Sequence, residues 1–487
     1  MKLHEYAAFD ALGLADLVRR GEVTPTELAR TAAAAIETVN PALGAVVETY
    51  PDRIESLDEA TLGHGPFRGV PFLLKDVFGH EAGRRIEFGS RLCAGLVAAQ
   101  DSIYTTLVKA AGVNVIGRSA APEYSMAGTT EGALYGNTST PWRAGHSAGG
   151  STGGGAAAVA AGLVPIAQGT DIAGSVRIPA SFCGGVGLKP SRGRVSFAPM
   201  LDENGYGLAQ NFVQTKSVRD TAAMLDGLAV PQPGDPFVIP RPAGTWADLA
   251  RQPAPRPLRI GWSVAAHTGV TVDPEVAAAI ERTARLLRDM GHQVEEDSPA
   301  YDGLAAMRAM CELWFFGFDQ RLAGYGQRTG RVPGPDNLEP MIWQIHEHAR
   351  TMTAAQFLAA MAMLNTARRQ LGAVFARRDV WLTPTTARVA EPWGLYNLGR
   401  DDVPYEAYAE QILAPVAQHT LPHNIMGTPA ISLPLFLHSN GLPIGVQLAA
   451  APAQELVLLQ LAGELEQALP WAGRTPPLHV AAVAGAR

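Results

Sequence analysis

The chain has 487 residues, of which 47% are hydrophobic, so it can bury an extensive core. Its formal net charge of −7 gives no electrostatic footprint for nucleic acid, and we expect a small or neutral substrate. No uncharged apolar run reaches the ~18 residues of a membrane span. Residues 1–5 lack the basic and apolar parts of a secretion signal, so we expect a cytoplasmic protein without a membrane partner.

The first half of the chain alternates predicted helices and strands. A capping box at Thr24 and Glu27 predicts a helix over residues 25–35 that stops before Asn40-Pro41. Short apolar segments between turn residues predict strands, with helical stretches between them. The predicted strands cover residues 69–74, 113–116 and 164–167, and one of the intervening helices covers 102–111.

The second half resumes the same alternation after a proline-rich stretch over residues 230–257. Residues 303–318 are apolar on most faces, which predicts a buried helix. Asn440-Gly441 is a strong turn signal and predicts a hairpin. The whole pattern favours an α/β sandwich. The other predicted elements are a strand over 258–262, a helix over 274–290 and a strand around Val294.

Two serines and one lysine form a candidate nucleophilic site. Ser151 and Ser175 lie in Gly- and Ala-rich segments, and Lys75 lies in the apolar segment 71–77. A serine hydroxyl needs an adjacent base to attack a carbonyl, and an amine desolvated by apolar neighbours is neutral often enough to serve. Arginine carries most other positive charge, so Lys75 is predicted to be kept for its titratable amine. Lysine is otherwise found only at Lys2, Lys109, Lys189 and Lys216.

These motifs resemble the amidase signature family. The run Gly-Gly-Ser-Thr-Gly-Gly-Gly over residues 149–155 is followed by Gly-Thr-Asp-Ile-Ala-Gly-Ser-Val-Arg over 169–177, with the lysine stretch upstream. The spacing between Ser151 and Ser175 also matches the family's. So long an ordered set is far more specific than any one Gly-rich fragment. Further matching segments lie at residues 187–194, 424–434 and 441–447.

The resemblance implies an α/β fold with a large mixed β-sheet sandwiched by α-helices, and a triad of Lys75, Ser151 and Ser175. Ser175 would attack an amide carbonyl, and Ser151, in a cis peptide bond, would pass its proton to neutral Lys75. The products would be a carboxylate and an amine. Backbone N–H groups would form the oxyanion hole, and the matching residues are Ile172, Ala173, Gly174 and Ser175.

Two residues depart from the family pattern. Ala173 stands where the family usually has glycine, and Thr152 replaces the usual second serine. Neither change removes a reacting group. Asp171 and Arg177, six positions apart around Ser175, are expected to brace the loop together with Thr152 rather than to carry protons.

The resemblance spans nearly the whole chain, which predicts one domain over residues 1–487, although length alone suggests roughly three. Within it we expect a signature core over 66–200 and a variable section over 228–350 that covers the site. Candidate substrate contacts are Tyr124, Met126, Cys311 and Trp314.

No cofactor or metal is implied. Cys93, Cys183 and Cys311 are too far apart for a zinc knuckle, and a phosphate-binding Gly motif is lacking. The expected partner is a small-molecule amide. The sequence leaves open whether the chain forms a homodimer.

Three alternatives remain at this point. Gly145-His146-Ser147-Ala148-Gly149 fits the nucleophile elbow of a Ser-His-Asp esterase, with Asp319 and His423 available, but a polar loop precedes it where the elbow needs a strand. The glutamine-hydrolysing component of the tRNA-dependent amidotransferase would share the triad. A catalytically silent binding protein has only Ala173 in its favour. We expect a stand-alone hydrolase of aryl amides or of linear or cyclic oligoamides.

Overall fold

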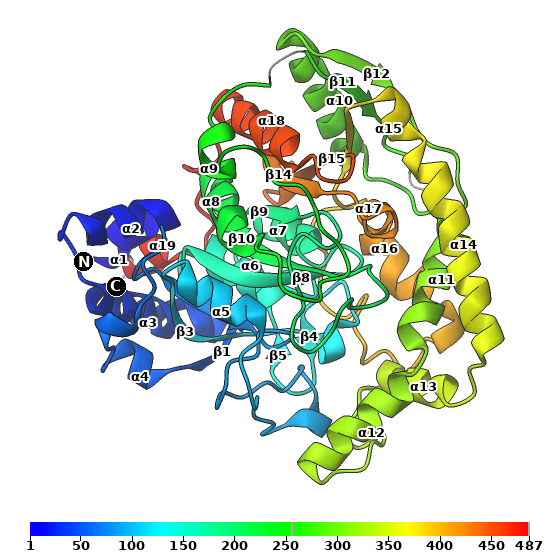
Figure 1. Ribbon diagram of the computed structural model, residues 1–487, viewed down its shortest axis with the longest axis horizontal. Coiled ribbons are helices and arrows are strands. Elements are labelled where there is room, and N and C mark those ends of the chain that lie inside the picture. Colours follow the sequence, from blue (N-terminus) through cyan, green and yellow to red (C-terminus); the bar gives the residue numbers. More distant parts are fainter. Residues whose placement is uncertain (255–256, 266, 486–487) are drawn as a thin grey trace.

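A single mixed sheet of eleven strands forms the centre of the computed structural model, which describes residues 1–254, 257–265 and 267–485 (Figure 1). Its spatial strand order is β1-β3-β2-β8-β10-β9-β14-β15-β13-β11-β12. The strands are β1 (Val46–Thr49), β2 (Pro71–Lys75), β3 (Asn114–Ser119), β8 (Ile166–Asp171), β9 (Val186–Lys189), β10 (Gln210–Thr215), β11 (Arg259–Trp262), β12 (Gln293–Glu296), β13 (Val380–Pro384), β14 (Ala430–Leu437) and β15 (Pro443–Ala450).

The pairing of the central strands joins the two ends of the chain. Strand β2 runs parallel to both β3 and β8, so the carboxyl ends of these three strands meet at one edge of the sheet. Strand β9 pairs with β10 on one side and with β14 on the other, both antiparallel. The C-terminal hairpin of β14 and β15 therefore lies beside the strands that carry the signature segments.

Helices sandwich this sheet, as the α/β prediction requires (Figure 1). Helix α6 (Gly153–Ala160) packs against β8 and β10, and α7 (Arg177–Cys183) packs against β9, β14 and β15. Helix α8 (Val218–Leu228) packs against β9 and β10. Helix α18 (Glu455–Ala468) covers the C-terminal hairpin, and α10 (Pro274–Asp289) packs against β12 and β13. None of the helices within the described ranges is long and apolar enough to cross a membrane.

The remaining helices lie around this core. Helices α1 and α19 pack together, so the two chain termini lie near each other (Figure 1). The longer ones are α1 (Leu3–Ala8), α2 (Ala11–Arg19), α3 (Pro25–Leu43), α5 (Ile103–Ala110), α11 (Gly303–Phe315), α12 (Phe318–Thr329), α13 (Pro340–Ala349), α14 (Ala354–Gly372), α17 (Leu421–Met426) and α19 (Val480–Gly485).

Two predicted helix ends were wrong. Helix α3 begins at Pro25 with the predicted capping box but continues through Pro41 to Leu43, because Val39 and Leu43 are buried and their packing outweighs the hydrogen bond that proline loses in the last turn. The helix predicted over residues 303–318 breaks at Gly317, whose φ of 70° is left-handed, and the chain turns into α12. The hairpin at Asn440-Gly441 is confirmed.

Candidate active site

Lys75 is the last residue of the buried strand β2, and its amine lies among three hydroxyl groups. Its Nζ is 2.7 Å from Ser151 Oγ, 3.1 Å from Thr152 Oγ1 and 2.7 Å from Thr170 Oγ1. The Lys75 side chain is fully buried. Because β2 and β8 are parallel, the lysine and Thr170 come together at the same sheet edge, where the following loops meet. The structure thus brings Lys75 and Ser151 into direct contact.

The hydrogen bonds around Nζ fit a neutral amine. Thr152 donates its hydroxyl proton to the Thr170 carbonyl oxygen at 3.3 Å, so Thr152 Oγ1 is an acceptor for Lys75. Burial holds the pKa of Lys75 well below its usual range, although the charges of Asp171 and Asp76 oppose the shift. A neutral amine has two N–H donors and one lone pair. It can donate to Thr152 and Thr170 and accept a proton from Ser151.

Ser151 is held in a tight loop just before α6. The Gly150–Ser151 peptide bond is cis. A Cβ at position 150 would overlap the Thr129 backbone, so only glycine fits there. Thr130 ties the loop together, because its Oγ1 donates to the Gly149 carbonyl oxygen at 2.8 Å and accepts the Gly153 N–H at 3.0 Å. The Ser151 hydroxyl is therefore directed at Lys75 by a rigid backbone.

Ser175 lies in the turn between β8 and α7. The Asp171 carboxylate organises this turn by accepting the Gly174 N–H at 2.8 Å and the Val176 N–H at 3.2 Å. Gly174 has a φ of 131°, and a Cβ there would overlap the Thr420 hydroxyl. Ser175 lines the same cavity as Ser151, so both hydroxyl groups face one space.

The backbone around Ser175 leaves N–H groups available for an oxyanion. In the described part of the chain, the N–H groups of Ile172, Ala173 and Ser175 have no acceptor, whereas that of Gly174 already donates to Asp171. Ala173 is not among the non-glycine residues with a positive φ, so alanine suits the turn. The Ala173 carbonyl oxygen accepts a hydrogen bond from Thr420 Oγ1 at 2.6 Å.

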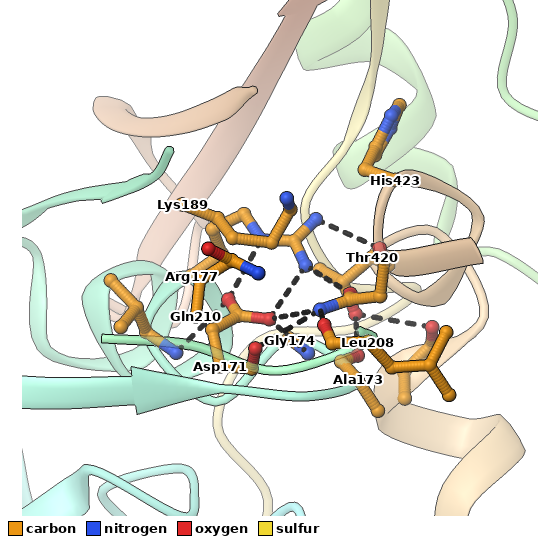
Figure 2. Close-up of polar contacts among 12 residues, drawn as sticks. Asp171, Ala173, Gly174, Arg177, Lys189, Leu208, Gln210, Thr420 and His423 are labelled. Atoms are coloured by element: carbon orange, nitrogen blue, oxygen red, sulfur yellow. Dashed lines mark hydrogen bonds and ion pairs between the residues drawn. The ribbon is translucent and has the colours of Figure 1, made fainter. Parts of the chain in front are cut away.

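A buried ion pair anchors the turn to the C-terminal part of the chain (Figure 2). Arg177 donates to both Asp171 oxygens at 2.9 Å. Its other N–H groups reach the Thr420 carbonyl oxygen at 2.8 Å, Gln447 Oε1 at 2.7 Å and Asn424 Oδ1 at 2.7 Å. Burial alone would raise the pKa of Asp171, but the Arg177 guanidinium lowers it to about 2. Asp171 and Arg177 thus form a charged pair behind the turn that carries Ser175.

An aromatic cavity lies over the two serines. Of the four residues predicted to contact the substrate, Tyr124 and Trp314 line this cavity, whereas Met126 and Cys311 are buried and are not among its described lining residues. An outer cavity adjoins it and shares several of its lining residues, among them Phe78, Phe88 and Trp314. The inner cavity is lined by Val77, Phe78, Phe88, Tyr124, Ser125, Ser151, Thr170, Asp171, Ile172, Ser175, Asn204, Ala209, Trp314, Phe318, Arg321 and Tyr325.

Comparison with known proteins places this site in a family. The family model described as Amidase matches residues 27–459. The chain belongs to the amidase family. It is 37% identical to the 6-aminohexanoate-cyclic-dimer hydrolase of Paenarthrobacter ureafaciens, over 96% of each chain. It is 31% identical to an acylamidase of Rhodococcus erythropolis, also over 96% of each. A solved 6-aminohexanoate cyclic dimer hydrolase complexed with substrate superposes with a TM-score of 0.91 at 36% identity, covering 97% of this chain and 99% of that one. This amidase therefore hydrolyses a carboxamide C–N bond.

The esterase arrangement is not assembled in this amidase. The prediction of a loop before Ser147 was wrong, because Ser147 ends a short strand, β7 (Arg143–Ser147), which pairs with residues 139–140. The Ser147 Oγ accepts the Gly149 N–H at 3.0 Å. His423 makes its contact with Thr428 Oγ1 at 3.2 Å, and within the described ranges no hydrogen bond connects it to Ser147. Metal-binding clusters of His, Cys, Asp and Glu are also lacking in the described part of the amidase.

Three residues of the site were not predicted from the sequence. Thr170 contacts Lys75, and Asn424 and Gln447 accept hydrogen bonds from Arg177. Each lies in a segment that matches a family motif, and this match was the signal that could have identified them. The other cavity residues could not be predicted, because they belong to no sequence motif and only the fold brings them together. They include Phe78, Phe88, Phe318, Arg321 and Tyr325.

The cavity wall also contains unusual backbone. Phe78, Phe88, Tyr124 and Ser125 have φ values of 60°, 55°, 50° and 61°, a region that non-glycine residues rarely adopt. All four line the inner cavity. Such conformations persist only where the surroundings enforce them, and they cluster at ligand sites.

Proposed function

We propose that this amidase acts through an acyl-enzyme on Ser175, with Ser151 and Lys75 as its proton relay. The observation that carries the proposal is the 2.7 Å contact between Lys75 Nζ and Ser151 Oγ in a buried site. Ser175 Oγ attacks the amide carbonyl carbon while its proton passes to Ser151, and the Ser151 proton passes to neutral Lys75. The C–N bond then breaks as the lysinium returns a proton through Ser151 to the leaving amine.

Water completes the cycle by the same path. It attacks the Ser175 ester, gives its proton to the relay, and releases the carboxylic acid and the free serine. The negative charge that develops on the carbonyl oxygen needs preorganised donors. We assign this role to the backbone N–H groups of Ile172, Ala173 and Ser175, because the Gly174 N–H is engaged by Asp171. Gly174 instead provides the shape of the turn.

The cavity supports a small amide as substrate. Residues 228–350 supply α11 and α12, whose side chains Trp314, Phe318 and Tyr325 line it, which supports the role of this section as a cover over the signature core of residues 66–200. Similarity to a cyclic-dimer hydrolase and to an acylamidase makes cyclic oligoamides and aryl amides the first substrates to test. We also propose a cytoplasmic location, which agrees with three free, buried cysteines.

A substrate panel tests the proposal. The purified chain alone is assayed with an anilide, a fatty amide, a peptide amide, the cyclic dimer of 6-aminohexanoate and glutamine. Ser175→Ala should abolish hydrolysis of every substrate that the wild type turns over, and Ser147→Ala should retain most of it. The reverse result would support the esterase arrangement. Activity confined to glutamine would instead support the amidotransferase component, and a folded chain inactive on all substrates would support a binding protein.

A further inference from the structure

One face of α12 carries positive charge into the active-site cavities. Arg321, Tyr325 and Arg328 are spaced i, i+4 and i+7 on this helix, so they share a face. All three line the outer cavity, and Arg321 and Tyr325 also line the inner cavity that contains Ser175. The face thus runs from the outer cavity to the wall around the nucleophile. Figure 1 shows α12 at the lower edge of the molecule, next to α13.

Ring contacts hold this face in place. The Tyr325 ring stacks on Tyr124, with centroids 5.9 Å apart, and contacts Phe88 at 4.8 Å. The Arg321 guanidinium lies 5.2 Å from the Phe318 ring centroid and donates to the Trp314 carbonyl oxygen at 2.9 Å. Arg321 is therefore positioned by its neighbours rather than free in solvent.

Neither arginine is neutralised by a carboxylate. Within the described residues, Arg321 and Arg328 form no ion pair, and the one hydrogen bond of Arg328 goes to the Val97 carbonyl oxygen at 3.4 Å. A third arginine of the outer cavity differs, because Arg350 pairs with Glu347 at 3.1 Å. The α12 face thus presents two guanidinium groups whose charge is available to a ligand.

The other titratable groups of the outer cavity do not neutralise the positive charge of the two arginines. Glu203 and Asp319 line it, but no described ion pair links either to Arg321 or Arg328. Burial, assisted by the charge of Arg328, lowers the pKa of His80 to about 4, so His80 is neutral at pH 7. Guanidinium groups match planar carboxylates through paired N–H donors.

We infer that Arg321 and Arg328 bind a carboxylate at the non-reacting end of the substrate. The substrate class would then be an amide with an acid group several bonds from the scissile C–N bond, such as a linear oligoamide or an N-acylated amino acid. This inference rests on the proposed function, since it takes the reacting carbonyl to lie at Ser175. The aromatic walls would hold the apolar part between the two ends.

Matched substrates test the inference. The monoanilide of adipic acid and the anilide of hexanoic acid differ by an acyl-side carboxylate, and 4-acetamidobenzoate and 4-methylacetanilide differ on the amine side. In at least one pair, kcat/KM should be about tenfold higher for the charged member, mainly through KM. Added NaCl should reduce this preference, because Arg328 is exposed to solvent and salt screens its charge.

Variants identify the residues. Arg321→Gln and Arg328→Gln should each lower the charged-to-neutral ratio of kcat/KM several-fold, and Arg321→Lys should restore part of it. Arg350→Gln is the matched control, because this arginine lines the same cavity but is already paired. If the wild type hydrolyses the neutral anilides without preferring either acid, or if the ratio in both Gln variants equals that of the wild type, the inference is wrong.

A binding measurement tests the carboxylate site independently of the proposed catalytic mechanism. Calorimetry with Ser175→Ala measures the affinity for adipic acid monoanilide and for hexanoic anilide without any turnover. Tighter binding of the acid that is lost in Arg321→Gln or Arg328→Gln supports the carboxylate site even if Ser175 is not the nucleophile. Equal affinity for both compounds overturns the site, whatever the wild type hydrolyses.

Discussion

Arg177 and Asp171 form a two-bond ion pair in which both side chains are completely buried, directly behind the turn that carries Ser175. Removing one partner leaves an uncompensated buried charge, which typically costs about 3–5 kcal/mol. Arg177→Ala should therefore lower the free energy of unfolding in urea by that amount. Arg19→Ala, which breaks an exposed ion pair with Asp16, should cost about 0–1 kcal/mol. Equal losses of unfolding free energy in the two variants would contradict a stabilising role for the Arg177–Asp171 pair.

The pH dependence of turnover should follow Lys75. The mechanism needs the neutral amine, so kcat/KM for an anilide should rise with pH through the pKa of the lysine in the free enzyme. Burial lowers that pKa well below its usual value, so the rise should be complete far below the ~10.4 of an exposed lysine. With chemistry rate-limiting, a profile that rises only near pH 10 would show that Lys75 titrates like an exposed lysine and would contradict this prediction.

Lys75→Ala should reduce kcat/KM by several orders of magnitude, because the Ser151 hydroxyl loses its proton acceptor. Lys109→Ala is a suitable control, since this lysine pairs with Asp101 and Glu81 away from the site. Substantial activity in Lys75→Ala would show that another group acts as the base.

We expect kcat to depend on the hydroxyl group of Thr152 more than on its methyl group. The hydroxyl accepts from Lys75, accepts the Thr170 N–H and donates to the Thr170 carbonyl oxygen. Thr152→Val keeps the shape but leaves these buried groups unpaired, at a cost of about 1–3 kcal/mol each, and should sharply lower kcat. Thr152→Ser should keep most of the activity. Comparable kcat values in the two variants would show that packing alone determines the choice of threonine.

Gly174→Ala should be strongly destabilising, because the backbone there has a φ of 131° and a Cβ would overlap the Thr420 hydroxyl. Gly372→Ala is the control: it lies at the end of α14 with open space around it, and alanine favours helix by up to about 1 kcal/mol. Thermal unfolding distinguishes the two, with a lower Tm expected only for Gly174→Ala.

Local signals allowed much of this molecule to be predicted. The apolar run before Lys75 predicted its strand, and the Gly-rich motifs predicted both serine loops. The structure places Lys75 and Ser151 in contact. The catalytic roles of the triad remain predictions. The loop contacts of Asn424 and Gln447 depend on β14 lying beside β9, which no local pattern encodes. The position of Arg321 could not be predicted either. Its sequence neighbours are typical of a surface helix, and it lines the cavity because the chain turns at Gly317 into α12.

The hydrogen bond between Arg177 and Gln447 also bears on how the protein reaches its active form. These residues are 270 positions apart, and the bond closes a loop of more than half the chain. Closing so long a loop is entropically costly and tends to come late in folding. A nascent chain on the ribosome would already hold both serine loops, yet their support would be missing until the hairpin of β14 and β15 emerged. The nucleophile turn therefore acquires its anchor long after its own residues have been synthesised.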